Sequence, residues 1–256
     1  VTQVGKGEHF GPVTPGTSLS RTPNGGTTVD PAAGPTPGAP NICFASGTRI
    51  MTAAGPRAID ALRPGDLLAV AEGGTVVLRW IGRRRITAPE LAAAPQDWPI
   101  RIAAGALGPG APARTLRVSP QHRLLLRGPL ARYLHGADEV LVPARALLGL
   151  RGISCPVPRG GVSYLHLLCD RHAVLIAEGA AAESLFLGPM ARRSIPRPSL
   201  RAVLTSFPEL GEPAPALPLL SMQESRRLAS ILRRSGAIAQ PCVAAAAATA
   251  AWPSAA

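Results

Sequence analysis

The 256-residue sequence has few aromatic residues, almost no lysine and few cysteines. Its three Trp, two Tyr and four Phe leave few rings that could stack on nucleic-acid bases. Lys6 is the only lysine among 27 basic residues, and the formal net charge is +12. Arg, Ala, Pro and Gly are all abundant and all have GC-rich codons, so we attribute the charge to composition. We therefore expect no nucleic-acid partner, although the run Arg83, Arg84 and Arg85 favours one.

The cysteines and the apolar runs exclude three further classes of protein. The cysteines are widely and irregularly spaced, which predicts neither a disulfide framework nor a CxxC metal pair; they are Cys43, Cys155, Cys169 and Cys242. We expect no metal ion and no cofactor. The longest apolar run, at residues 243–251, is alanine-rich and shorter than the roughly 20 residues of a transmembrane helix. The N-terminal stretch has no basic-then-apolar pattern, so no signal peptide is predicted.

Glycine and proline divide the chain into a linker and a domain. They are concentrated in residues 1–41, which have no apolar period, and we expect a flexible linker there. Residues 42–206 contain many short apolar stretches separated by turn residues, and only short helical signals at 88–94 and 143–148. This pattern predicts an all-β domain. The expected strands are 48–52, 57–62, 66–71, 75–87, 100–104, 115–118, 122–126, 140–142, 164–169 and 172–177.

The last 50 residues, 207–256, are rich in proline and then in alanine. Ser221 and Glu224 have the spacing of a capping box, which predicts a helix over about 221–235 that stops at Gly236. Its apolar residues form one stripe, and its arginines lie largely off that stripe. Two interpretations are open: a peripheral helix docked on the domain, or a helix that binds a membrane surface or a partner. Beyond residue 241 we expect disorder.

Three blocks of the sequence suggest chemistry. The first begins at Cys43, directly after the linker, where a core cysteine is unusual because core cysteines normally lie inside strands. The second is Ser119-Pro120-Gln121-His122. The third spans residues 163–172 and contains His166, Asp170 and His172, whose common parity would place them on one face of an unbroken strand. Cys169 has the opposite parity and is predicted to lie in the core.

On these blocks the sequence resembles the Hint domain, the self-processing module of inteins and Hedgehog C-terminal regions, and most closely its bacterial Hedgehog/intein-type members. The resemblance covers residues 42–206. The matching segments are the Cys43 block and residues 59–67, 80–85 and 100–108. A further match is Ser119-x-x-His122, where the family usually has Thr-x-x-His. It implies an all-β Hint fold of two interlocked β subdomains with pseudo-twofold symmetry. It also implies that the block containing His166, Asp170 and His172 faces the active centre.

The implied reaction is cleavage of the Ile42–Cys43 peptide bond. The Cys43 sulfur is tethered beside this bond, so its attack on the Ile42 carbonyl is intramolecular and gives a thioester by an N-to-S acyl shift. His122 is the candidate to protonate the departing nitrogen, and Ser119 to bond the scissile peptide or the oxyanion. The alternatives are a buried small hydrophobe for Cys43, an ordinary strand histidine for His122 and a turn residue for Ser119. His166 either assists proton transfer or is structural.

The sequence departs from inteins where they end in His-Asn, since residues 179–184 end in Glu183-Ser184 and offer no asparagine to cyclise. We therefore expect no full splicing, but a single-turnover cleavage whose cis substrate is the chain's own N-terminal segment. Water or a small nucleophile would resolve the thioester. We expect a monomer, and the resemblance implies an exported bacterial protein. The alternative function is a catalytically degenerate Hint fold that serves as a structural or secretion-linked interaction module.

Overall fold

The computed structural model describes residues 19–21, 27–29, 42–188, 191–192, 195, 197–211 and 214–236. The chain divides into two compact units, Val1–Gly38 and Ala39–Ala256. In the first unit, strands β1 (Leu19–Arg21) and β2 (Thr27–Val29) pair antiparallel. The rest of the predicted linker at 1–41, and the predicted disorder beyond residue 241, lie outside the described residues.

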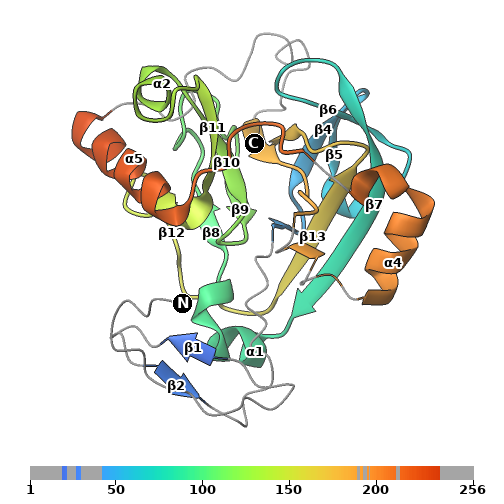
Figure 1. The fold of residues 1–256 in the computed structure, drawn as a ribbon. Helices are drawn as coiled ribbons and strands as arrows, with labels where there is room; N and C mark the ends of the chain where they lie inside the picture. The colour runs from blue at the N-terminus through green and yellow to red at the C-terminus, as the bar shows by residue number, and fades with distance from the viewer. Residues whose placement is uncertain are drawn as a thin grey trace, which may run out of the picture. The chain divides into compact units, whose positions relative to one another are not determined.

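The described part of the second unit is built on a thirteen-stranded sheet (Figure 1). Its strand order is β11-β10-β15-β14-β4-β6-β7-β13-β3-β9-β8-β12, with β5 paired to β4, and the paired strands run antiparallel. This mostly-β, antiparallel architecture confirms the predicted all-β fold class, while the twofold relation of two subdomains stays a prediction. The strands are β3 (Phe44–Ala45), β4 (Arg49–Thr52), β5 (Gly55–Ala58), β6 (Leu67–Ala69), β7 (Thr75–Ile86), β8 (Ile100–Ile102), β9 (Leu116–Val118), β10 (Arg123–Arg127), β11 (Glu139–Pro143), β12 (Ile153–Ser154), β13 (Val162–Cys169), β14 (Val174–Ala177) and β15 (Ala180–Glu183).

Strand β7 lies between β6 and β13 and so links the part of the sheet from β11 to β6 with the part from β13 to β12. Its first residues pair with β6, and its longer remainder pairs with β13 from Cys169–Leu78 to Val162–Ile86. The turn before β7 contains Gly73 and Gly74 at φ of 95° and 81°, a backbone region that other residues rarely adopt. The strand predicted over 75–87 and its glycine turn are therefore confirmed. Through this strand, the region near Cys43 shares one sheet with β4, β6 and β14.

Helices are few and lie around the sheet. None of those described is long and apolar enough to cross a membrane. The α-helices are α1 (Ala88–Ala93), α2 (Pro129–His135), α4 (Arg197–Ser206) and α5 (Met222–Ser235). The 3-10 helices are η1 (Ile59–Ala61), η2 (Pro95–Asp97), η3 (Ala144–Leu147) and η4 (Pro208–Gly211).

Several elements differ from the pattern predicted by the sequence. The strand expected over 57–62 is wrong in its second half, where η1 turns the chain. Strand β15 was not predicted because alanine has low strand propensity, and its pairing with β14 and β10 decides its structure. Helices α2 and α4 were not predicted either. For α2 the signals are present, since Pro129 occupies the first turn and Gly136 ends the helix at φ 68°.

Helix α5 confirms the capping prediction. The Ser221 hydroxyl accepts a hydrogen bond from the Glu224 N–H at 3.3 Å, and the Glu224 carboxylate accepts one from the Ser221 N–H at 2.8 Å. Gly236 ends the helix in the left-handed region. Leu228, Ala229 and Leu232 are buried in the main hydrophobic core. The helix is therefore docked on the sheet domain through its apolar stripe, the first of the two interpretations.

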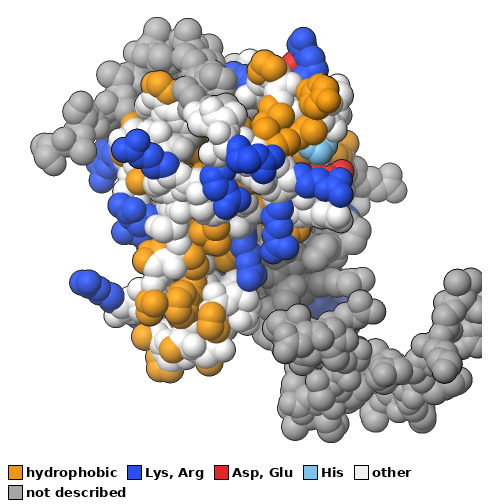
Figure 2. Space-filling model, turned by 90° about the vertical axis from the view of Figure 1, so that its left-hand side faces the viewer, with side chains coloured by type: hydrophobic (Ala, Val, Ile, Leu, Met, Phe, Trp, Pro, Cys, Tyr) orange, Lys and Arg blue, Asp and Glu red, His pale blue; other side chains and the backbone are white. Residues whose placement is uncertain are grey.

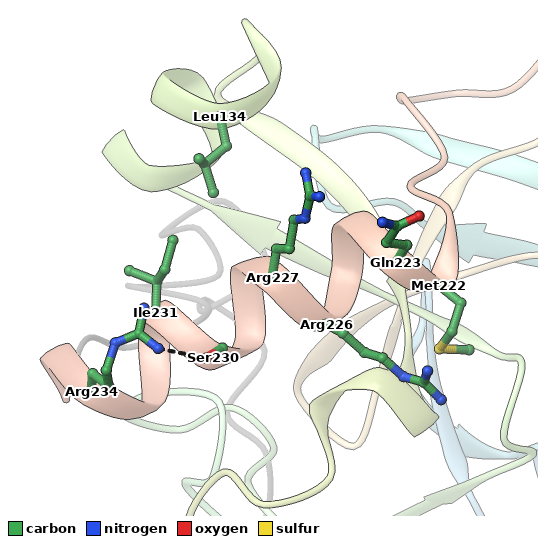
Figure 3. A pocket seen from close by; sticks show the side chains of 8 residues that line it. All are labelled: Leu134, Met222, Gln223, Arg226, Arg227, Ser230, Ile231 and Arg234. Atoms are coloured by element: carbon green, nitrogen blue, oxygen red, sulfur yellow. Dashed lines mark hydrogen bonds between the residues drawn. The ribbon is translucent and has the colours of Figure 1, made fainter.

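The outer face of α5 is basic. Arginine side chains gather on this side of the molecule, with hydrophobic side chains among them (Figure 2). An open pocket of about 770 Å³ lies here, and Leu134 of α2 faces Ile231 of α5 across it (Figure 3). Arg226 and Arg227 also line this pocket, and Arg234 donates a hydrogen bond to the Ser230 hydroxyl at 2.7 Å.

The segment between η4 and α5 joins the edge of the sheet. The Leu141 N–H of β11 donates to the Pro218 carbonyl at 2.9 Å, and the Leu220 N–H donates to the Leu141 carbonyl at 3.0 Å. We call the described residues 214–220 the strap. The boundary between a domain at 42–206 and a tail at 207–256 stays a prediction. The strap and α5, which belong to the predicted tail, pack against the sheet of the predicted domain.

Candidate active site

The register of strand β3 places Cys43 between two other strands. Phe44 pairs with Leu165 of β13 on one side and with Val118 of β9 on the other. Because an antiparallel register continues residue by residue, Cys43 comes opposite His166 on the first side and opposite Ser119 on the second. Three residues that are far apart in the sequence are thus brought together by two short strand pairings.

His166 contacts both the Cys43 sulfur and the Ile42 carbonyl oxygen. Its ring nitrogens lie 3.4 Å (Nδ1) and 3.3 Å (Nε2) from the Cys43 Sγ. Its Nδ1 also lies 2.9 Å from the Ile42 carbonyl oxygen. A carbonyl oxygen can only accept, so this hydrogen bond assigns the ring proton to Nδ1 and leaves Nε2 as the proton acceptor. One imidazole can therefore polarise the carbonyl and receive the thiol proton.

Ser119 holds the nitrogen of the same peptide bond. Its hydroxyl oxygen accepts a hydrogen bond from the Cys43 N–H at 3.0 Å, and its own N–H donates to the Cys43 carbonyl at 2.9 Å. The carbonyl oxygen, the nitrogen and the adjacent sulfur of the Ile42–Cys43 unit thus each contact a polar side chain. Ile42 and Cys43 are themselves buried.

His122 lies at the end of the turn that Ser119 begins. Its N–H donates to the Ser119 carbonyl at 3.1 Å, and its ring centroid lies 4.2 Å from that of Phe44. The side chain is fully buried, and burial lowers the pKa of His122 to about 4. The Glu183 carboxylate opposes this shift. The imidazole is therefore neutral at neutral pH and has to gain a proton before it can act as an acid.

Burial also keeps the Cys43 side chain a neutral thiol. It raises the pKa of Cys43 well above its usual value, against the opposing effects of the Arg84 guanidinium and of the Ser119 hydrogen bond. Arg84 lies 3.8 Å from Asp97, whose charge acts in the raising direction. Burial lowers the pKa of His166 as well. The resting site therefore pairs an uncharged thiol with an uncharged imidazole.

Asp170 and His172 have surroundings of their own. Strand β13 ends at Cys169 with a register shift after Leu168, so the unbroken strand that would have aligned them with His166 is not formed. The Asp170 N–H donates to the Val77 carbonyl at 2.9 Å, and His172 contacts Glu183 and the backbone of the strap. Cys169 is buried in the main core, as predicted.

Two charged residues near the site were missed by sequence reasoning. In the sequence, Arg84 stands out only as part of an arginine run, yet the charge of its guanidinium lowers the pKa of the Cys43 thiol, against the effect of burial. Its neighbour Arg83 pairs with Asp60 at 3.3 Å. Glu183 was noted only for standing where inteins continue to asparagine. Neither residue belongs to a motif that would have identified it. In the part of the chain described here, no three His, Cys, Asp or Glu side chains are arranged to hold a metal ion.

Comparison with known proteins identifies the family. The family model of the Hint domain matches residues 42–189. Among solved structures, a bacterial intein-like domain from Clostridium thermocellum is 15% identical, with 56% of this chain and 98% of that chain covered and a TM-score of 0.39. The MchDnaB-1 intein is 11% identical, with 56% and 99% covered and a TM-score of 0.34. No curated protein is matched. The sequence match extends over more than half of the chain, and the chain belongs to the Hint domain family.

Proposed function

We propose that this chain cleaves its own Ile42–Cys43 peptide bond through an N-to-S acyl shift at Cys43, without full splicing. The observation that carries the proposal is the position of His166, 2.9 Å from the Ile42 carbonyl oxygen and 3.3 Å from the Cys43 Sγ. Membership of a self-processing family supports it. Burial supports the cis character of the reaction, since a nucleophile enclosed beside its own peptide bond needs no external substrate.

In the first step, the Cys43 sulfur bonds to the Ile42 carbonyl carbon, and the bond between that carbon and the Cys43 nitrogen breaks. His166 Nε2 takes the thiol proton, while its Nδ1–H stabilises the charge that develops on the carbonyl oxygen. Ser119 holds the nitrogen in place. His122 receives the proton that the thiol gave to His166 and delivers it to this nitrogen, which completes the free α-amine and leaves both imidazoles neutral again. The product is a thioester of Ile42 on the Cys43 sulfur.

In the second step, water or a small thiol attacks the thioester carbon. The Cys43 thiol is regenerated, and the segment ending at Ile42 leaves as a carboxylic acid or as a new thioester. The segment 180–184 ends in Glu183-Ser184 and has no asparagine, so this chemistry contains no cyclisation that would free the other side. The reaction therefore stops at N-terminal cleavage.

The test is a fusion of a folded partner ahead of Val1, incubated with dithiothreitol and followed by intact-mass spectrometry. We expect a fragment ending at Ile42 in the parent protein and an intact chain for Cys43→Ala. Cys169→Ala is the matched control, because Cys169 is also a buried cysteine, with its pKa raised by burial to about 12. This control should still cleave. A parent chain that stays intact after long thiol incubation would refute self-cleavage and favour a structural or interaction module.

A further inference from the structure

A group of buried polar side chains extends from His122 of the proposed site. It comprises His122, Glu183 and His172, and all three are almost completely enclosed. Both ring nitrogens of His122, the His172 Nε2 and the Glu183 Oε2 lack a well-aligned hydrogen bond among the described residues. Unsatisfied buried polar atoms are uncommon in folded proteins and suggest a functional role. The mechanism above uses His122 and leaves Glu183 without a role.

The pairing of β10 with β15 brings Glu183 to the residue that follows His122. Leu124 pairs with Ala182, so Glu183 comes opposite Arg123. The Arg123 N–H donates to the Glu183 Oε1 at 2.9 Å, and the Arg123 guanidinium lies 3.5 Å from the same oxygen. Both donors contact one oxygen of a carboxylate that is fully buried. The carboxylate is thereby fixed opposite the residue that follows His122, whose imidazole is neutral and buried.

The strap contacts His172, whose ring lies near the second oxygen of the carboxylate. The Ala216 N–H donates to the His172 Nδ1 at 2.9 Å, which makes Nδ1 an acceptor and assigns the proton of the neutral ring to Nε2. That Nε2 lies 3.3 Å from the Glu183 Oε2. The Nε2 therefore lies close to the carboxylate oxygen that Arg123 does not contact, without an aligned hydrogen bond to it. Arg123 and His172 thus flank Glu183 on its two oxygens.

We propose that Glu183 is a positioning residue for self-cleavage, whose buried charge allows His122 to carry a proton during the reaction. The inference rests on the proposed function, in which His122 must gain and then deliver a proton. Imidazolium is strongly disfavoured in an apolar enclosure, and a fixed carboxylate close by offsets part of that penalty. Glu183 acts through His122 and does not touch the scissile bond.

The charges around His122 support this assignment. Burial lowers its pKa most, and the largest opposing effect is that of Glu183. The backbone of Cys43 acts in the same raising direction as Glu183, whereas His166 and Arg123 act in the lowering direction. The Phe44 ring that packs on His122 carries no charge. Glu183 is thus the only carboxylate among the groups that shift this imidazole.

The test compares cleavage by the parent, Glu183→Gln and Glu178→Gln fusions at pH 7. Glu183→Gln keeps an oxygen that can accept the Arg123 N–H and removes the charge. We expect it to slow cleavage at least tenfold while the thermal unfolding midpoint shows that the fold is retained. Glu178 is the matched control, because it is also buried and accepts a backbone N–H, from Arg49 at 2.7 Å. Its variant should cleave at close to the parent rate.

A double-mutant cycle separates a role through His122 from a general structural role. In a His122→Ala background, Glu183→Gln should have little further effect on the rate. Equal slowing with and without His122 would overturn the proposal, and so would an unchanged rate in the single variant.

A second measurement does not depend on cleavage. In Cys43→Ala protein at pH 5, the ring ¹⁵N shifts of His122 report its protonated fraction. We expect about a tenfold drop in Glu183→Gln, because a nearby opposite charge typically shifts a pKa by one unit or more, and no drop in Glu178→Gln. If the parent fusion fails to cleave, the proposed function fails while this measurement still decides the role of Glu183. An unchanged fraction would overturn it.

Discussion

The buried imidazole of His122 should make the fold sensitive to acid. Its pKa is about 4 in the folded chain, against 6.5 for an ordinary histidine. Between these two values the unfolded chain binds a proton and the folded chain does not, so the free energy of unfolding falls as the pH falls through this window. At 1.36 kcal/mol per pKa unit, the loss contributed by His122 is on the order of 3 kcal/mol between pH 7 and pH 4. For a single domain this is a large part of the total stability.

The assay is urea unfolding of Cys43→Ala protein, in which cleavage is blocked, at several values between pH 7 and pH 4. The same series is measured for Cys43→Ala combined with His122→Gln. All other titrating groups are common to both proteins, so the difference between the two pH dependences isolates His122. The double variant should lose about 3 kcal/mol less on acidification. Parallel pH dependences in the two proteins would show that His122 is not held neutral by burial, and the reasoning would be wrong.

Two further predictions concern the catalytic contact and the docked helix. His166→Ala should slow cleavage by about 100-fold or more, because it removes the thiol-proton acceptor and the donor to the Ile42 carbonyl. Mass-spectrometric time courses measure the rate, with His135→Ala in α2 as the control. A His166→Ala rate equal to the parent's would exclude His166 as the proton acceptor. Ser221→Ala should lower the free energy of unfolding by about 1 kcal/mol, since it removes the cap of α5. Urea unfolding measures this, the exposed Gln223→Ala is the control, and equal stability of both variants would contradict the capping argument.

The residues of the site could be read from the sequence, but their mutual arrangement could not. The blocks that contain Cys43, Ser119, His122 and His166 stand out because their residue types suit acyl transfer. Strand β3, which aligns Cys43 with His166 and Ser119, is only two residues long and has no periodicity to detect. Its position is set by pairing with β9 and β13, which are distant in the sequence. Tertiary pairing, and no local preference, decides the contact on which the chemistry depends.

Long-range strand pairing, which local sequence does not reveal, also explains where the observed fold differs from the predicted one. The long strand β7 was predictable because twelve consecutive residues are rich in β-branched and apolar types. Strand β15 was not, since Ala180, Ala181 and Ala182 favour a helix in isolation and form a strand only between β10 and β14. The alignment expected for His166, Asp170 and His172 depended on an unbroken strand. The register shift after Leu168 and the end of β13 remove that condition, and no local signal in the sequence announces either feature.

The burial that encloses the proposed site determines how its protons have to move. A cysteine at the surface could react as a thiolate formed by exchange with water, but the enclosed Cys43 has a raised pKa and the two imidazoles beside it have lowered ones. Separating a thiolate and an imidazolium at rest would place two charges in a region of low dielectric, which is unfavourable without compensating charge. The proton must therefore leave the sulfur as the new bond forms, through a base already in contact, and His166 is in that position. The leaving nitrogen needs an acid that is charged only during the step. In the proposed mechanism, the Glu183 carboxylate supports such a transient charge on His122, so self-cleavage would require both histidines and this buried acid.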